Sequence, residues 1–263
     1  MNEPQLVAAL RAAGCVFAEE EARLLLDEAS SPGELMAWAA RRMAGEPLEY
    51  VVGWAEFAGV RVAVDPGVFV PRRRSELVIS VALREPAQVV VDLCCGTAAF
   101  GTALSRHWPR AEVHAADADP AAVACARRNL PRERVHEGDL YAALPAELAG
   151  EVDLVVANAP YVPTDAIATM PRDARDHEHR IALDGGTDGL DVVRRVVAGA
   201  PAWLRPGGRL VVETGRDQAD VVAASFAASG LSPTVESDDE IGGTVVLGRR
   251  ISGDRPGSGR ISR

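Results

Sequence analysis

The stretch "VVVDLCCGTAAFG", residues 89–101, decides the fold class of this 263-residue chain. Its three valines predict a buried strand, and Asp92 stands at the end of that strand. A turn of small residues around Gly96 then leads into a segment with helical spacing from about residue 99. Small residues in such a turn let a ligand approach the backbone N–H groups at the start of the helix. The stretch alone fits a ligand site in an α/β protein and a plain tight turn equally well.

The chain after Ser75 repeats this alternation of apolar strands and helices. Strands are predicted over residues 88–95, 111–117, 134–140, 152–158 and 208–215. Helices are predicted over residues 75–85, 99–107, 120–130, 189–204 and 217–230. Alternation of this kind predicts a Rossmann-like parallel sheet covered by helices on both faces. Two last strands, 231–238 and 243–250, flank a short acidic turn and predict a C-terminal antiparallel hairpin.

The segments before Ser75 and after residue 250 differ in character. Residues 1–45 have helical spacing, and we expect a small N-terminal helical domain there that docks the substrate. Residues 46–74 alternate apolar and polar residues between Gly and Pro turns, which predicts a β-hairpin connector. Residues 75–250 then form the main domain. Residues 251–263 are rich in Gly, Ser and Arg and are predicted to be disordered.

Composition limits the classes of function. The formal net charge of −10 argues against a broad nucleic-acid-binding face, because such binding depends on neutralising phosphates. No apolar run approaches the roughly 20 residues of a membrane span, and the N-terminus does not resemble a signal peptide. The four cysteines contain no C-x-x-C pair, so we expect reduced thiols and no metal site. These features favour a cytoplasmic, monomeric protein that does not bind a membrane.

Acidic residues follow the next two predicted strands. Asp117 lies 21 residues after Gly96, where an acidic residue in such folds accepts hydrogen bonds from ribose hydroxyls. Asp119 precedes a proline and is expected to cap the next helix. Asp139 could reach an adenine amino group, with Leu140 against the ring, although an ordinary Asp turn is an equal alternative. With no G-x-G-x-x-G or P-loop pattern, the set favours a nucleoside cofactor without a pyrophosphate grip, and S-adenosyl-L-methionine fits.

The fourth strand ends in "NAPY", residues 158–161. The side-chain carbonyl of Asn158 and a backbone carbonyl of the Ala159-Pro160 turn could accept both hydrogen bonds from an acceptor nitrogen. Held in this way, the nitrogen would point its lone pair at a methyl group. Pro160 restricts the turn, and Tyr161 offers a flat face to a planar group. A glutamine side-chain amide and an amino group of a nucleic-acid base both meet these needs.

Four stretches together resemble the release-factor glutamine N5-methyltransferase family, which uses S-adenosyl-L-methionine. They are "GEPLEYVVGWAEFAGVRVAVDPGVFVPRRRSE" (45–76), residues 89–101, "NAPY" and "EHRIALDGGTDGLDVVRRVV" (178–197), so the resemblance covers nearly the whole chain. It implies a cofactor site formed by Asp92, Cys94, Cys95, Gly96, Thr97, Ala98, Asp117, Asp139, Leu140 and Asn158. It implies that Asn158, Ala159, Pro160 and Tyr161 bind the acceptor amide and carry catalysis.

The family resemblance implies a protein partner. The chain also departs from the family pattern in three places. The expected acceptor is the glutamine of the Gly-Gly-Gln loop in a peptide chain release factor. Ala159 replaces the first proline of the family motif, while Cys94, Cys95 and Ala98 replace residues of its glycine loop. Arg73-Arg74 replace a Pro-acid pair, and the basic run Arg72–Arg74 could meet a phosphate. Two alternatives therefore stay open: an enzyme that methylates an amino group on rRNA, tRNA or DNA, and a non-catalytic binding module.

Overall fold

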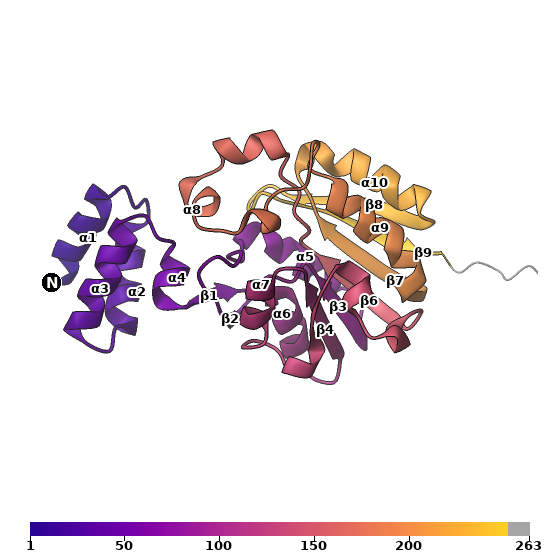
Figure 1. The fold of residues 1–263 in the computed structure, drawn as a ribbon, viewed down its shortest axis with the longest axis horizontal. Helices are drawn as coiled ribbons and strands as arrows, with labels where there is room; N and C mark the ends of the chain where they lie inside the picture. The colour runs from indigo at the N-terminus through magenta and orange to yellow at the C-terminus, as the bar shows by residue number, and fades with distance from the viewer. Residues whose placement is uncertain (252–263) are drawn as a thin grey trace, which may run out of the picture.

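The computed structural model describes residues 1–251 and contains a seven-stranded sheet (Figure 1). Its strands are β3 (Val89–Leu93), β4 (Glu112–Asp117), β5 (Val135–Glu137), β6 (Val152–Ala157), β7 (Leu204–Glu213), β8 (Leu231–Asp238) and β9 (Gly243–Arg250). They lie in the order β5-β4-β3-β6-β7-β9-β8. Neighbours from β5 to β7 are parallel, and β9 is antiparallel to both β7 and β8. The predicted Rossmann-like sheet with a C-terminal antiparallel hairpin is confirmed.

Helices cover both faces of the sheet because each central strand is apolar on both sides. On one face lie α5 (Glu76–Ala82), α6 (Ala99–His107) and α7 (Pro120–Ala126), and on the other lie α9 (Asp191–Trp203) and α10 (Ala219–Ala228). Val90 packs with the first group, whereas its neighbour Val91 packs with the second. Consecutive strand residues point to opposite faces, so this sheet has two separate cores.

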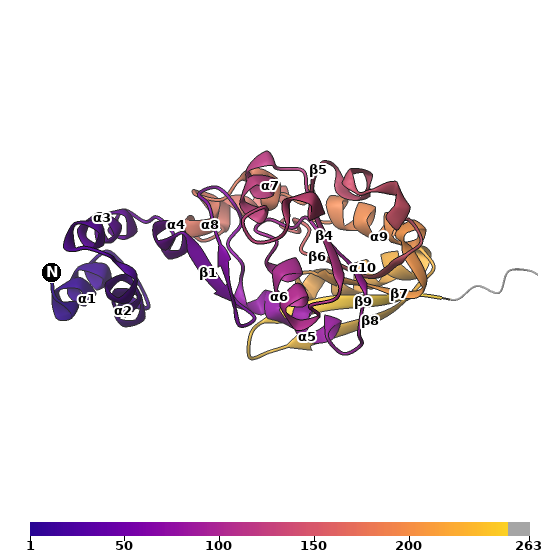
Figure 2. The same cartoon turned by 90° about the horizontal axis from the view of Figure 1, so that it is seen from below.

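The N-terminal helices form a third core of their own. They are α1 (Glu3–Ala12), α2 (Ala18–Glu28) and α3 (Pro32–Met43), which bury Leu6, Leu10 and Leu25 between them. Both views show this unit at one end of an elongated molecule (Figures 1 and 2). Ser31 caps α3 by accepting the Glu34 N–H, and Pro32 occupies the first turn of the helix.

The connector is only in part the predicted β-hairpin. Its first residues form a short helix, α4 (Leu48–Val52), so the prediction of extended chain there is wrong. Pro47 precedes this helix, and Gly53 ends it with a left-handed φ of 81°, which confines the helical turn to five residues. The hairpin itself consists of β1 (Trp54–Phe57) and β2 (Val60–Ala63).

The other elements are short. The helix α8 covers Arg172–Arg175, and 3-10 helices cover Arg73–Ser75 (η1), Arg132–Arg134 (η2), Leu140–Ala143 (η3), Ala146–Leu148 (η4), Thr164–Thr169 (η5), Arg180–Ala182 (η6) and Arg216–Gln218 (η7). Within residues 1–251, every helix is too short or too polar to cross a membrane. The predicted disordered tail, apart from residue 251, lies outside the described residues.

Candidate active site

A cavity of about 230 Å³ lies where the carboxyl ends of β3, β4 and β6 meet. This is the position expected for a ligand, beside the switch in strand order between β3 and β6. Of the predicted site residues, the cavity is lined by Asp92, Cys94, Cys95, Gly96, Thr97, Asp117, Asp139, Leu140, Asn158 and Pro160. Ala98, Ala159 and Tyr161 do not line it, and Ala98 and Ala159 are completely buried behind it.

Much of the remaining wall comes from segments to which we assigned no cofactor role. It includes Val68, Phe69 and Pro71 of the connector, Ser75 directly after the connector, and Ile181, Ala182 and Arg195 after β6. The first group belongs to the connector, so the connector forms part of the ligand site and does more than join two domains. The apolar run "GVFVP" (67–71) has no strand partner in the sequence pattern, and that signal could have pointed to a cavity wall.

The turn after β3 keeps a glycine-like backbone even where glycine is absent. Cys94, Gly96 and Ala98 have φ values of 54°, 54° and 57°. Residues with a Cβ atom adopt this left-handed conformation at a cost of about 1–2 kcal/mol each. The turn is tied to the neighbouring strand, because the Gly96 N–H donates to Asp117 at 2.8 Å. The substitutions therefore alter the side chains of this turn and leave its path suited to close approach by a ligand.

Three aspartates around the cavity have different local partners. Asp117 accepts hydrogen bonds from the Gly96 and Asp119 N–H groups, at 2.8 and 2.9 Å, and burial raises the pKa of its carboxyl group. Asp119 caps α7 through the Ala121 N–H, as predicted, and its other oxygen contacts His179 at 2.6 Å. Asp139 forms an exposed ion pair with Arg195 of α9. Asp117 is thus the most deeply enclosed carboxylate of the three.

The residues of the cavity fit S-adenosyl-L-methionine. Ser75 Oγ is buried at the wall and has no hydrogen-bond partner within residues 1–251, so a polar group of a ligand would satisfy it. Phe69 and Leu140 supply apolar surface for an adenine ring, and Asp117 supplies acceptors for ribose hydroxyls. Carboxylates around the cavity also favour the positive charge of a sulfonium.

Residues 158–161, which we call the acceptor turn, directly follow β6. Asn158 lines the cavity, and its side chain makes no hydrogen bond with any other residue in the described part of the chain, so its carbonyl is free to accept one. Tyr161 is fixed at its far end, because its hydroxyl donates to Glu213 at 2.9 Å and accepts from Arg74 Nε at 3.2 Å. Burial, together with the negative Glu213, raises the pKa of Tyr161 and keeps the hydroxyl protonated. We assigned Glu213 no role from sequence, yet its side chain is only 1% exposed.

The basic run is largely neutralised within the protein. Arg72 pairs with Glu178, and Arg74 pairs with Glu213, while Arg73 is exposed. Glu178 lies in a polar stretch of the sequence, yet its side chain is fully buried and accepts the Val70 N–H at 3.0 Å. Two of the three arginines are therefore engaged with carboxylates, which weakens the interpretation of this run as a phosphate site.

Comparisons with known proteins also identify the chain as a methyltransferase. Residues 59–174 match the family model described as the methyltransferase small domain. The chain is 38% identical over 234 residues to the release factor glutamine methyltransferase of Geobacter sulfurreducens, covering 86% of this chain and 81% of that protein. Several further bacterial proteins of that name are similar to a comparable degree. A 4-amino-L-phenylalanine/4-methylamino-L-phenylalanine methyltransferase of Streptomyces pristinaespiralis is 37% identical, covering 76% of this chain and 71% of that protein.

A solved structure supports the fold. The methyltransferase from Pyrococcus furiosus superposes with a TM-score of 0.56 at 16% identity, covering 73% of this chain and 90% of that one. This structure confirms the predicted fold, and the family model and the curated relatives confirm the predicted family and its cofactor. Taken together with the cavity and the acceptor turn, these relationships mean that the chain is an S-adenosyl-L-methionine-dependent methyltransferase and belongs to the release factor glutamine methyltransferase family.

Proposed function

We propose that this enzyme methylates the side-chain nitrogen of a glutamine in a protein, and that the glutamine lies in the Gly-Gly-Gln loop of a translation release factor. The observation that carries the proposal is the unpaired Asn158 side chain, which lines the cofactor cavity next to Pro160. Release factors act in the cytoplasm, so the reaction would take place there. We expect the enzyme to act as a monomer.

The chemistry asks the protein to orient a weak nucleophile. When bound, S-adenosyl-L-methionine supplies an electrophilic methyl group. The amide nitrogen has two N–H bonds, and the Asn158 carbonyl and a backbone carbonyl of the following turn would accept them. This arrangement would aim the nitrogen lone pair into the cavity and stabilise the positive charge that grows on the nitrogen. Both acceptors are neutral, so the proposal needs no general base with a shifted pKa.

A protein substrate would need a second contact outside the cavity, and the N-terminal unit offers one. Val16 and Phe17, at the corner between α1 and α2, are 82% and 66% exposed. They border a second cavity of about 430 Å³ between this corner, the end of α3 and the segment 172–177. Exposed apolar side chains beside a concave surface are typical of protein-binding sites. We therefore propose that residues 1–45 dock the release factor.

One other acceptor class has support. The relative from Streptomyces pristinaespiralis is named for an amino acid that carries an aromatic amine. Methylation of a nucleic-acid base has less support, because Arg72 and Arg74 are already paired.

The deciding experiment supplies labelled S-adenosyl-L-methionine with one acceptor in each tube. The acceptors are purified release factors, ribosomal RNA and 4-amino-L-phenylalanine, and peptide mass mapping locates any methyl group on protein. Label on the Gly-Gly-Gln glutamine is expected, and Asn158→Ala should abolish it. Label only on RNA or only on the amino acid would overturn the proposal. Label on a glutamine elsewhere would keep the chemistry and change the partner.

A further inference from the structure

The acceptor turn is held from behind by one amide side chain. We propose that Gln218 is a positioning residue for methyl transfer, acting through the carbonyl group of Tyr161. This inference rests on the proposed reaction at the acceptor turn but not on which acceptor is used. Gln218 ends the 3-10 helix η7, which follows β7 and leads into α10. It lies far from Tyr161 in sequence and does not line the cofactor cavity.

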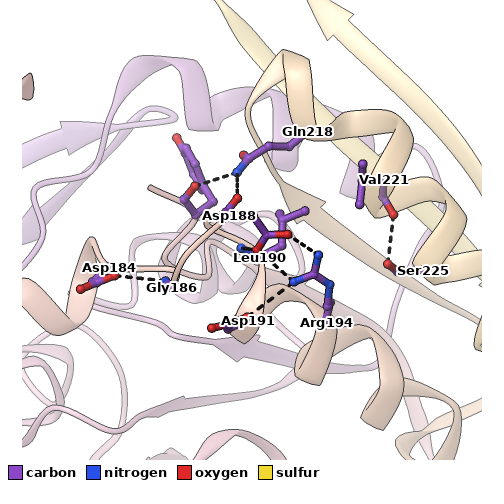
Figure 3. A network of polar contacts seen from close by, with 10 residues as sticks. Asp184, Gly186, Asp188, Leu190, Asp191, Arg194, Gln218, Val221 and Ser225 are labelled. Carbon is purple, nitrogen blue, oxygen red and sulfur yellow. Dashed lines mark hydrogen bonds and ion pairs between the residues drawn. The ribbon is translucent and has the colours of Figure 1, made fainter. Parts of the chain in front are cut away.

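All polar atoms of the Gln218 side chain are engaged. Its Nε2 donates to the Tyr161 carbonyl at 3.0 Å and to the Asp188 carbonyl at 3.1 Å. Its Oε1 accepts the Gly215 N–H at 3.1 Å, which fixes which end of the amide faces the turn. Figure 3 shows the Gln218 side chain reaching from its helix to Asp188. The amide thus joins the end of β7, the loop around residue 188 and the acceptor turn.

The loop around residue 188 lies directly against the acceptor turn. A Cβ atom added to Gly189 would stand 2.3 Å from the Tyr161 carbonyl oxygen, and one added to Gly185 would stand 2.7 Å from the Pro160 carbonyl oxygen. Both distances are too short for any side chain. The two glycines therefore allow the loop to support the carbonyl groups of the turn at van der Waals distance.

This loop is itself anchored to α9. The Asp188 carboxylate accepts two hydrogen bonds from Arg194, at 3.0 and 2.5 Å, and one from the Leu190 N–H at 3.2 Å (Figure 3). By donating to both carbonyl groups, Gln218 holds the Tyr161 carbonyl beside a loop that is itself bonded to α9. Tyr161 is fixed at both ends, since Glu213 holds its hydroxyl group.

These contacts do the work that a second proline ring would otherwise do. Ala159 lacks the ring that restricts φ, so the peptide groups from Asn158 to Tyr161 need another restraint. A hydrogen bond to the Tyr161 carbonyl restrains the last of these peptide planes. Without it the acceptor nitrogen would bind but would be aimed less well, which lowers kcat more than it raises KM.

Three variants test the inference. Gln218→Met keeps the shape of the side chain and removes its hydrogen bonds. Gln218→Glu keeps the oxygen that accepts the Gly215 N–H and removes the donor. Ser225→Ala is the matched control, because it removes a side-chain hydrogen bond to the Val221 carbonyl within α10, away from the acceptor turn.

We expect Gln218→Met to lower kcat about tenfold, while KM for the acceptor and the Kd for S-adenosyl-L-methionine change by less than about threefold. Gln218→Glu should be equally slow near pH 8 and should recover, relative to wild type, near pH 5.5. The Tyr161 and Asp188 carbonyl oxygens would face the new carboxylate and disfavour its charged form, so its pKa should lie above the usual value of about 4.3. The protonated carboxyl group then regains a donor, which Gln218→Met lacks. Ser225→Ala should match the wild type. A folded Gln218→Met variant with unchanged kcat, or a loss of kcat matched by the same loss of cofactor affinity, would overturn the inference.

A readout without an acceptor keeps this test separate from the proposed function. The Val162 and Thr164 N–H groups donate to the Leu183 and Gly186 carbonyls, so hydrogen exchange at these amides reports how firmly the turn is held. We expect faster exchange there in Gln218→Met, with exchange in β3 unchanged. Unchanged exchange at both amides would refute the positioning role. If wild type methylates no release factor, the proposed function fails, and this readout still decides the role of Gln218.

Discussion

Replacing Asp117 with alanine tests which side chain holds the cofactor. The Asp117 carboxylate ends β4, lines the cavity and already accepts hydrogen bonds from the Gly96 and Asp119 N–H groups. A carboxylate accepts about four hydrogen bonds in all, so both oxygens retain capacity for the two hydroxyl groups of a ribose. Asp117→Ala removes those acceptors and also releases the turn at Gly96.

The expected loss of affinity follows from the number and type of these bonds. A hydrogen bond to a charged group contributes about 1.5–3 kcal/mol. Two such bonds, partly replaced by water in the variant, imply a loss of about 3 kcal/mol, or roughly 150-fold in Kd. Stability should change much less. The variant frees two backbone N–H groups, but it also removes a carboxylate whose burial is unfavourable.

The pH dependence of stability provides an internal check on the same residue. Burial raises the pKa of Asp117 above its unfolded value, so the folded protein binds this proton more tightly than the unfolded chain does. The Asp117 contribution therefore favours the folded state at low pH and declines as pH rises from the unfolded value through the raised pKa. Asp117→Ala should flatten the stability profile in that interval, as urea unfolding at several pH values would measure.

Isothermal titration calorimetry with S-adenosyl-L-methionine measures the binding effect directly. The matched control is Asp65→Ala, which removes one carboxylate from an exposed pair with Arg128. The control should bind within about twofold of wild type, since exposed ion pairs contribute little. If folded Asp117→Ala also binds within twofold, the assignment of Asp117 to the ribose is refuted.

Three further predictions concern other parts of the molecule. Glu213→Gln removes the charged partner of Arg74 and weakens the hydrogen bond from Tyr161, so kcat should fall about tenfold, and an unchanged kcat would contradict this. Tm should change little, because the lost ion pair is offset by no longer burying a carboxylate. A chain shortened to begin at Glu46 should bind cofactor in calorimetry but lose release-factor methylation in the label assay, and full methylation would disprove docking by the N-terminal unit. A chain that begins at Arg74 should also lose cofactor binding, because Val68, Phe69 and Pro71 line the cavity. Burial lowers the pKa of His136, so the unfolded chain binds a proton there before the folded protein does, and stability falls as pH drops below about 6.5. In urea unfolding, His136→Gln should lose less unfolding free energy than wild type as pH drops, and an equal loss in the two proteins would count against this assignment.

The sheet could be predicted from sequence because its signals are local. Strands such as residues 152–157 are apolar except for one residue, and the helices between them have regular spacing, so the α/β class follows without long-range information. The turn residues that bind ligands in this fold follow strand ends, which also made Asp117 and Asn158 visible. Element ends were less accurate. The prediction for residues 48–52 failed because a run of only five residues with a single charged side chain fits a short helix as well as a strand.

The contacts between distant segments could not be predicted. Glu178 sits in a polar stretch, and only the fold brings it to Arg72, 106 residues earlier, where it becomes buried. Glu213 and Gln218 carry no motif that separates them from ordinary strand-end and helix-start residues. Their roles depend on Tyr161, which approaches them only after β6 and β7 pair in the sheet. Hydrophobic periodicity reports local structure and does not predict contacts between residues that are distant in sequence.

The packing of Gly185 and Gly189 against the acceptor turn changes how sequence variation in this enzyme should be interpreted. The turn accommodates alanine at position 159, where the side chain is buried but small, whereas neither glycine has room for a single added methyl group. A saturation mutagenesis screen for activity should therefore tolerate small residues at 159 and reject every substitution at 185 and 189. When newly sequenced homologues are sorted into active and inactive groups, an intact pair of these glycines is the better criterion than a complete Asn-Pro-Pro-Tyr motif.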